Sequence, residues 1–139
     1  MGKTENLRKQ HEDMVGLVTK MSAILNCEKL SKDANEMRSL LSQLAGKVNI
    51  HLAMEDKALY PHLLGHSDDK LKNIARNYIA EMGDIGTTFK GYLSKWPDPT
   101  SIQKTPDLFI KETKGLFDVL SKRIAKENKE LYPLVDSLN

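Results

Sequence analysis

The chain has 139 residues, a formal net charge of +2 at pH 7, and a hydrophobic fraction of 40%. This length suits one domain with a core of its own, so residues 1–139 are expected to form a single domain. Lysines and acidic residues are interspersed, which excludes the basic surface that nucleic acid requires. No apolar run reaches the length of a membrane span. Because the charged start of the chain does not resemble a secretion signal, the sequence predicts a cytoplasmic protein.

Helix-breaking residues divide the chain into four long segments. The predicted helices cover residues 4–26, 33–64, 68–96 and 105–138. Gly65 lies in the second break, and Pro97 and Pro99 lie in the third. Within each segment apolar residues recur at spacings of three and four, which is typical of helices packed in a bundle. The breaks are short, so the expected fold class is all-α, as an up-down-up-down four-helix bundle.

Polar residues interrupt these apolar stripes in one layer of the predicted bundle. They are His11 on the first helix, His51 and Glu55 on the second, and Arg123 and Glu127 on the fourth. In an up-down bundle these positions fall at the same depth near one end, where the third helix contributes Tyr78 and Met82. A single polar residue in a stripe is usually a satisfied core group. Five at one level indicate a site.

The second and fourth segments repeat each other. Residues 44–63 align with residues 116–135, and the Glu, Lys, Leu, Tyr and Pro of the pattern recur in register. Such a repeat places paired carboxylates and histidines around an approximate two-fold axis, as in two-metal bundles. In this arrangement Met82 and Arg123 occupy the positions where symmetry predicts histidine.

These patterns resemble the hemerythrin-like, or HHE cation-binding, family. The resemblance rests on His11, on His51-x-x-x-Glu55 followed by Leu59-Tyr60-Pro61, and on Glu127 followed by Leu131-Tyr132-Pro133. It implies an up-down four-helix bundle that holds a non-haem di-iron centre. Members of the family bind oxygen, sense oxygen or redox state, handle nitric oxide, or store iron.

The resemblance implies metal ligands at His11, His51, Glu55 and Glu127. Tyr78, Met82 and Arg123 are predicted to line the site at positions where the family has ligands. Two imidazoles and two carboxylates suit one iron or other divalent metal and are few for two. Because a guanidinium is a permanent cation, it repels a metal ion. We therefore expect Arg123 to pair with Glu55 and Glu127 in place of a metal, unless its side chain extends outward.

Three functions remain open on these residues. The leading interpretation is a hemerythrin-like binding or sensing module with a partly degenerate site. It would bind a metal ion weakly, singly or not at all, with a small diatomic molecule as a further ligand. The first alternative is a di-iron protein that handles oxygen, nitric oxide or peroxide, or stores iron. The second is a structural or interaction protein with a salt-bridged vestigial site. The small ligand count favours a binding module over an enzyme.

Tyr60 and Tyr132 are interpreted as aromatic packing at the helix ends.

Overall fold

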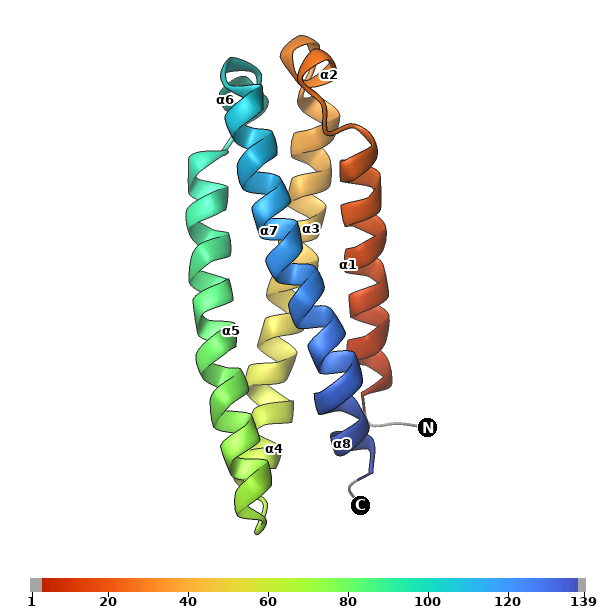
Figure 1. The fold of residues 1–139 in the computed structure, drawn as a ribbon, viewed down its shortest axis with the longest axis vertical. Coiled ribbons are helices and arrows are strands. Elements are labelled where there is room, and N and C mark those ends of the chain that lie inside the picture. The colour runs from red at the N-terminus through yellow and green to blue at the C-terminus, as the bar shows by residue number, and fades with distance from the viewer. Residues whose placement is uncertain (1–3, 138–139) are drawn as a thin grey trace.

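The computed structural model describes residues 4–137, with the backbone alone described at Met82 and Gly83. These residues form four helical columns that alternate in direction, with both described ends of the chain at the same end of the bundle (Figure 1). The columns are α1 (Glu5–Ala23); α3 (Asn35–Met54) with η1 (Glu55–Leu59) and α4 (Tyr60–Leu64); α5 (Asp69–Lys95); and α7 (Pro106–Lys126) with η2 (Glu127–Leu131) and α8 (Tyr132–Asp136). The predicted four-helix bundle is confirmed. No helix in this part of the chain is long and apolar enough to cross a membrane.

Two of the predicted breaks contain short helices. They are α2 (Cys27–Lys32) and α6 (Pro99–Lys104), which lie at the end of the bundle opposite the termini (Figure 1). Each begins at a capping side chain, because Asn26 accepts a hydrogen bond from the backbone N–H of Lys29 and Asp98 accepts one from Ser101. A side-chain cap satisfies an N–H that has no partner within the helix. The chain therefore reverses direction at these two connections through a short capped helix.

The second and fourth columns each widen into one π-helical turn, directly after a glutamate of the polar layer. The backbone N–H of Tyr60 donates to the carbonyl of Glu55, and that of Tyr132 donates to Glu127, five residues back in both cases. A proline follows each tyrosine, and a proline ring clashes with the carbonyl four residues before it. A wider turn relieves that clash. As a result, residues five apart in these turns point in the same direction.

The apolar core is divided into two clusters, with the polar layer between them. The larger cluster contains Met14, Val48 and Leu120, and the smaller one, near the termini, contains Leu7, Leu59 and Leu131. On each contributing column the polar residues fall between these two sets of positions. The layer is thereby closed above and below by apolar side chains, which lowers the local dielectric constant and strengthens electrostatic interactions there.

Candidate metal centre

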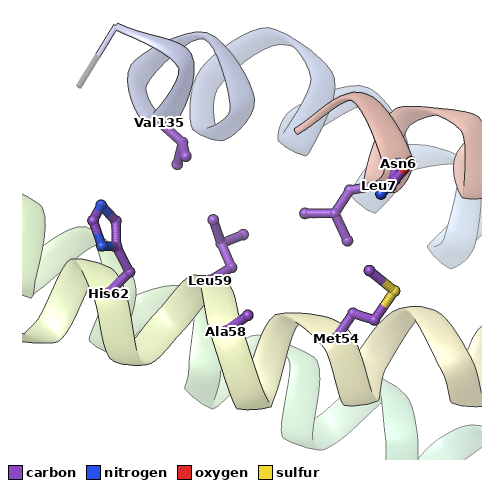
Figure 2. A pocket seen from close by; sticks show the side chains of 7 residues that line it. All are labelled: Asn6, Leu7, Met54, Ala58, Leu59, His62 and Val135. Atoms are coloured by element: carbon purple, nitrogen blue, oxygen red, sulfur yellow. The ribbon is translucent and has the colours of Figure 1, made fainter. Parts of the chain in front are cut away.

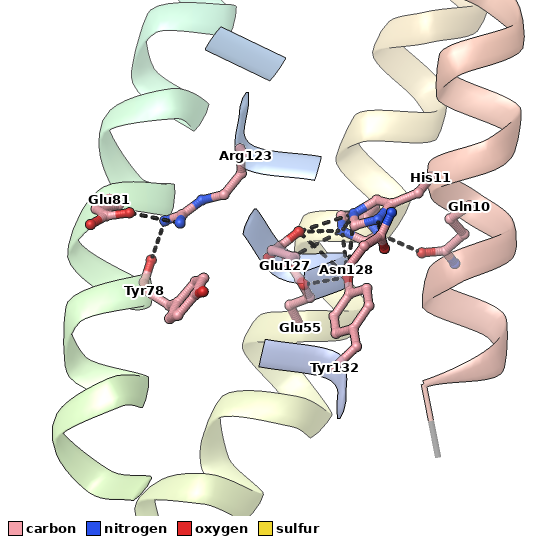
Figure 3. Close-up of polar contacts among 10 residues, drawn as sticks. Gln10, His11, Glu55, Tyr78, Glu81, Arg123, Glu127, Asn128 and Tyr132 are labelled. Carbon is pink, nitrogen blue, oxygen red and sulfur yellow. Dashed lines mark hydrogen bonds and ion pairs between the residues drawn. The ribbon is translucent and has the colours of Figure 1, made fainter. Parts of the chain in front are cut away.

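Four side chains meet in the polar layer (Figure 3). His11 comes from α1, His51 from the end of α3, Glu55 from the start of η1, and Glu127 from the start of η2. Each is at most 2% exposed. The structure therefore brings together the four residues that the resemblance implied as ligands, from three of the four columns.

Three of these residues direct their ligand atoms at one point. The Nε2 atoms of His11 and His51 are 3.1 Å apart, and Oε1 of Glu127 is 3.0 Å from the first and 3.5 Å from the second. Zinc and similar ions bind such atoms at about 2.0–2.2 Å, so neighbouring ligands in a tetrahedral site lie about 3.4 Å apart. The observed spacings are close to that value. The buried group of His11, His51 and Glu127 could therefore hold a metal ion.

Glu55 lies at the edge of this group. Its Oε1 is 3.3 Å from Nε2 of His51, and its Oε2 accepts a hydrogen bond of 2.9 Å from the hydroxyl of Tyr132. Among the described residues, Oε1 of Glu55 and Oε2 of Glu127 are buried without a hydrogen-bond partner. An unpaired buried carboxylate oxygen is costly, and a cation is the ligand that would satisfy it. The donor set therefore fits a divalent metal.

The pKa values of Glu55, Glu127 and His51 are shifted in different directions. Burial and the charge of Glu127 raise the pKa of Glu55 above its usual range, despite the opposing effect of His51, whose Nε2 lies 3.3 Å from Oε1. Burial would also raise the pKa of Glu127, but hydrogen bonds from His11, His51 and Glu55 outweigh it and lower that pKa. Burial would lower the pKa of His51, but hydrogen bonds and charges from both carboxylates raise it to about 9. In the metal-free protein, His51 and Glu55 therefore hold protons more strongly than usual, and these protons offset the negative charge of the carboxylates.

The whole bundle, including this layer, matches a known family. The model of the hemerythrin HHE cation binding domain matches residues 2–135. The chain belongs to this family. No curated protein and no solved structure gives a match to the sequence. Membership agrees with the helical bundle and the buried His-His-Glu group, whereas the full di-iron ligand set of the hemerythrin family is reduced here.

Arg123 does not pair with the central carboxylates, so the predicted Arg–Glu–His network is wrong. Its Nη1 atom lies 2.6 Å from Oε2 of Glu81 on α5, and its guanidinium stacks over the ring of Tyr78 with 4.5 Å to the centroid. No ion pair joins it to Glu55 or Glu127 within residues 4–137. The side chain is long enough to reach the neighbouring helix, where a half-exposed carboxylate is cheaper to pair with than a buried one.

The two other predicted lining residues have different outcomes. The hydroxyl of Tyr78 donates to Glu130 at 3.4 Å, so it binds an exposed carboxylate rather than one in the central group. Tyr78 is buried beside Arg123 and forms the wall of the layer on the α5 side (Figure 3). The side chain of Met82 lies outside the described residues, so its predicted place in the site stays a prediction.

Tyr132 enters the site, although we interpreted it from the sequence as aromatic packing. Its hydroxyl lies 2.9 Å from Glu55, 3.4 Å from Glu127, and 3.3 Å from the Nε2 atom of each histidine. The π turn brings this about, because it places Tyr132 on the same face as Glu127, five residues earlier. The proline after the tyrosine was the signal in the sequence for this change of register.

Removing the hydroxyl of Tyr132 should destabilise the metal-free protein. In Tyr132→Phe, Oε2 of Glu55 loses its 2.9 Å donor while remaining buried, and we expect unfolding to cost about 1–3 kcal/mol less. Tyr60→Phe is the matched control at the repeated position, because the buried hydroxyl of Tyr60 has no hydrogen-bond partner among residues 4–137. Urea denaturation of both variants measures the difference. Equal losses in the two variants would mean that the bond to Glu55 contributes nothing.

Two amides that no sequence pattern indicated complete the layer. Gln10 accepts from Nδ1 of His51 at 2.8 Å, and Asn128 lies 2.9 Å from Nδ1 of His11. Each is the sequence neighbour of a central residue, since Gln10 precedes His11 and Asn128 follows Glu127. Each amide contacts a histidine on a different column, and periodicity along a single helix does not indicate contacts of this kind.

Proposed function

We propose that this hemerythrin-like domain binds one divalent transition-metal ion, with His11, His51, Glu55 and Glu127 as ligands. The observation that carries the proposal is the convergence of two imidazole Nε2 atoms and one carboxylate oxygen at 3.0–3.5 Å, with less than a twentieth of each side chain exposed. Nitrogen and oxygen ligands of this kind suit zinc, ferrous iron or manganese.

The charges of the site support a single dication. Two ionised carboxylates and two neutral imidazoles carry a net charge of −2, which one divalent ion neutralises. The unpaired oxygens of Glu55 and Glu127 would then gain a partner. In the metal-free protein the same role falls to protons, held by His51 and by the carboxylate pair.

A second metal ion is disfavoured by the α5 side of the layer. There the guanidinium of Arg123 lies over Tyr78 and against Glu81, so the space on that side already contains a permanent cation. Arginine stays protonated at all accessible pH values and offers only donors. Position 123 therefore supplies no ligand, and its charge opposes a second dication.

Binding at this site would join three columns of the bundle, which suits a metal-responsive binding or sensing module. Ligands come from α1, from the α3–η1 junction and from η2. An ion that binds the folded state alone stabilises it in proportion to the logarithm of its free concentration. The domain would thus convert a change in metal concentration into a change in its stability.

A metal titration of chelator-treated protein tests this function. We expect Zn²⁺, Fe²⁺ under anaerobic conditions, and Co²⁺ each to bind with a stoichiometry of one per chain, and we expect Co²⁺ to give intense visible bands of a tetrahedral site. Elemental analysis of protein purified from iron-replete cells measures the native metal. Each bound ion should also raise the midpoint of thermal unfolding.

Two other results would favour the alternatives. Two irons per chain with oxo-bridge absorption bands would indicate a di-iron protein and would require Arg123 to leave the layer. Binding of no metal at micromolar concentrations would indicate a structural or interaction domain whose carboxylates are satisfied by protons alone.

A further inference from the structure

Each site histidine is held from behind by an amide. The two imidazoles face each other through Nε2, and their Nδ1 atoms point outward to Gln10 and Asn128 (Figure 3). Gln10, on α1, contacts His51 of α3, whereas Asn128, on η2, contacts His11 of α1. The two amides therefore tie together the same three columns that supply the ligands.

The orientation of the Gln10 amide is fixed by a second contact. Its Nε2 atom lies 2.8 Å from the sulfur of Met54, a residue that also lines the apolar groove at the lower end of the bundle (Figure 2). A thioether sulfur has no hydrogen to give and can only accept. The NH₂ group must therefore face Met54, which leaves the carbonyl oxygen toward His51. Because a carbonyl oxygen only accepts, Nδ1 of His51 carries a hydrogen.

Asn128 occupies the equivalent place behind His11. It is half-buried and lies at the inner side of a groove of about 460 Å³ between α1 and α7, which is also lined by Arg8 and Glu12. Its Oδ1 atom faces Nδ1 of His11 at 2.9 Å. His11 lines the same groove, and the amide takes the hydrogen bond that water in the groove would otherwise make with Nδ1.

These contacts decide where the lone pairs of the site point. With Nδ1 donating to the amide, the nitrogen that gives up its proton to a metal ion is Nε2, and its lone pair then faces the centre. The two Nε2 atoms are 3.1 Å apart, and two lone pairs at that distance repel unless a cation lies between them. Metal-binding histidines use the same device, since their second nitrogen usually donates to a fixed acceptor.

We propose that Gln10 and Asn128 are positioning residues that accept a hydrogen bond from Nδ1 of each imidazole, turn both Nε2 atoms toward the centre, and so preorganise it for a cation. This inference rests on the proposed metal site for its purpose, but the contacts of the two Nδ1 atoms are a property of the metal-free protein. The amides act through the histidines and touch no metal themselves. Their loss should weaken metal binding while leaving the four ligands in place.

The decisive experiment replaces Asn128 and reads the tautomer of His11 directly. Long-range ¹H–¹⁵N correlation spectra of the metal-free wild-type protein should show hydrogen on Nδ1 of His11. In Asn128→Leu, Nδ1 of His11 should lose its hydrogen and leave hydrogen on Nε2 alone, where Glu127 is 3.0 Å away and can accept it. The affinity for Zn²⁺ should fall about 10- to 100-fold in Asn128→Leu and in Gln10→Leu.

Two kinds of control separate positioning from general damage. Asn128→Asp and Gln10→Glu keep an acceptor for the Nδ1 hydrogen and should restore both the tautomer and the affinity. Gln43→Leu removes an exposed amide from α3 and should change neither. An unchanged His11 tautomer in Asn128→Leu would overturn the inference. If instead the wild-type protein shows hydrogen on Nδ1 of both histidines and binds no Zn²⁺, the metal function fails and the positioning of the rings stands.

Discussion

Glu127→Gln is expected to abolish tight metal binding while the domain remains folded. Oε1 of Glu127 lies within 3.5 Å of the Nε2 atoms of both histidines, so it is the central oxygen of the ligand group. The amide of glutamine has nearly the same shape but lacks the negative charge. Replacing outer-shell residues already costs about 10- to 100-fold in affinity, and we expect a loss of more than about 100-fold here. Competition with a chelator of known affinity measures the dissociation constant for Zn²⁺.

The matched control for this substitution is Glu130→Gln. Glu130 belongs to the same π-helical turn, but it is exposed and contacts Tyr78 instead of the histidines. Its replacement changes the net charge by the same amount, so it reports the long-range electrostatic effect alone. If both variants bound Zn²⁺ with the affinity of the wild-type protein, the ion would lie elsewhere on the chain.

The bundle and the meeting of four polar side chains could be predicted from the sequence, because both depend on helical periodicity. His11, His51, Glu55 and Glu127 interrupt apolar stripes, and a stripe must face the core wherever the helix packs. The depth of each residue along its helix then follows from short connections and an alternating direction. The four therefore had to meet if the bundle formed at all.

The contacts of Arg123 and Tyr132 depend on features that periodicity does not contain. Periodicity places the Cα atom of Arg123 on the inner face, but the long side chain extends to Glu81 on the neighbouring helix. A regular α-helix would direct Tyr132 away from Glu127, and only the widened turn before Pro133 brings the two together. The three-dimensional structure is needed to see which partner the flexible side chain of Arg123 reaches. It is also needed to see the one-residue change of register before Tyr132.

The same limit applies to the amides. Gln10 precedes His11 in the sequence and yet binds His51, so its partner is set by the approach of α1 to α3. An amide beside a ligand in sequence is common and carries no signal by itself. The significance of Gln10 and Asn128 comes from two outward-facing Nδ1 atoms and two carbonyl oxygens that meet them across helix boundaries.

Metal affinity should increase strongly with pH, because a proton must leave His51 before a metal can bind there. Burial lowers the pKa of His51, but hydrogen bonds and charges from Glu127 and Glu55 outweigh it and raise the pKa to about 9. Between about pH 6.5 and 9 each bound ion then displaces about one proton, so the affinity for Zn²⁺ should rise about tenfold per pH unit. Chelator competition at four pH values across this range measures the slope.

The stability of the metal-free protein should change in the opposite direction. Since the pKa of His51 is higher in the folded state than in the unfolded state, its contribution is fully present below about pH 6.5 and is lost as the pH rises through about 9. The raised pKa of Glu55 acts in the same direction, because the folded state resists losing that proton as well. Denaturant unfolding with and without Zn²⁺ should therefore show a gap that widens from pH 6.5 to 9. A gap that is constant with pH would mean that no proton is exchanged for the metal, and the ion would then not bind His51.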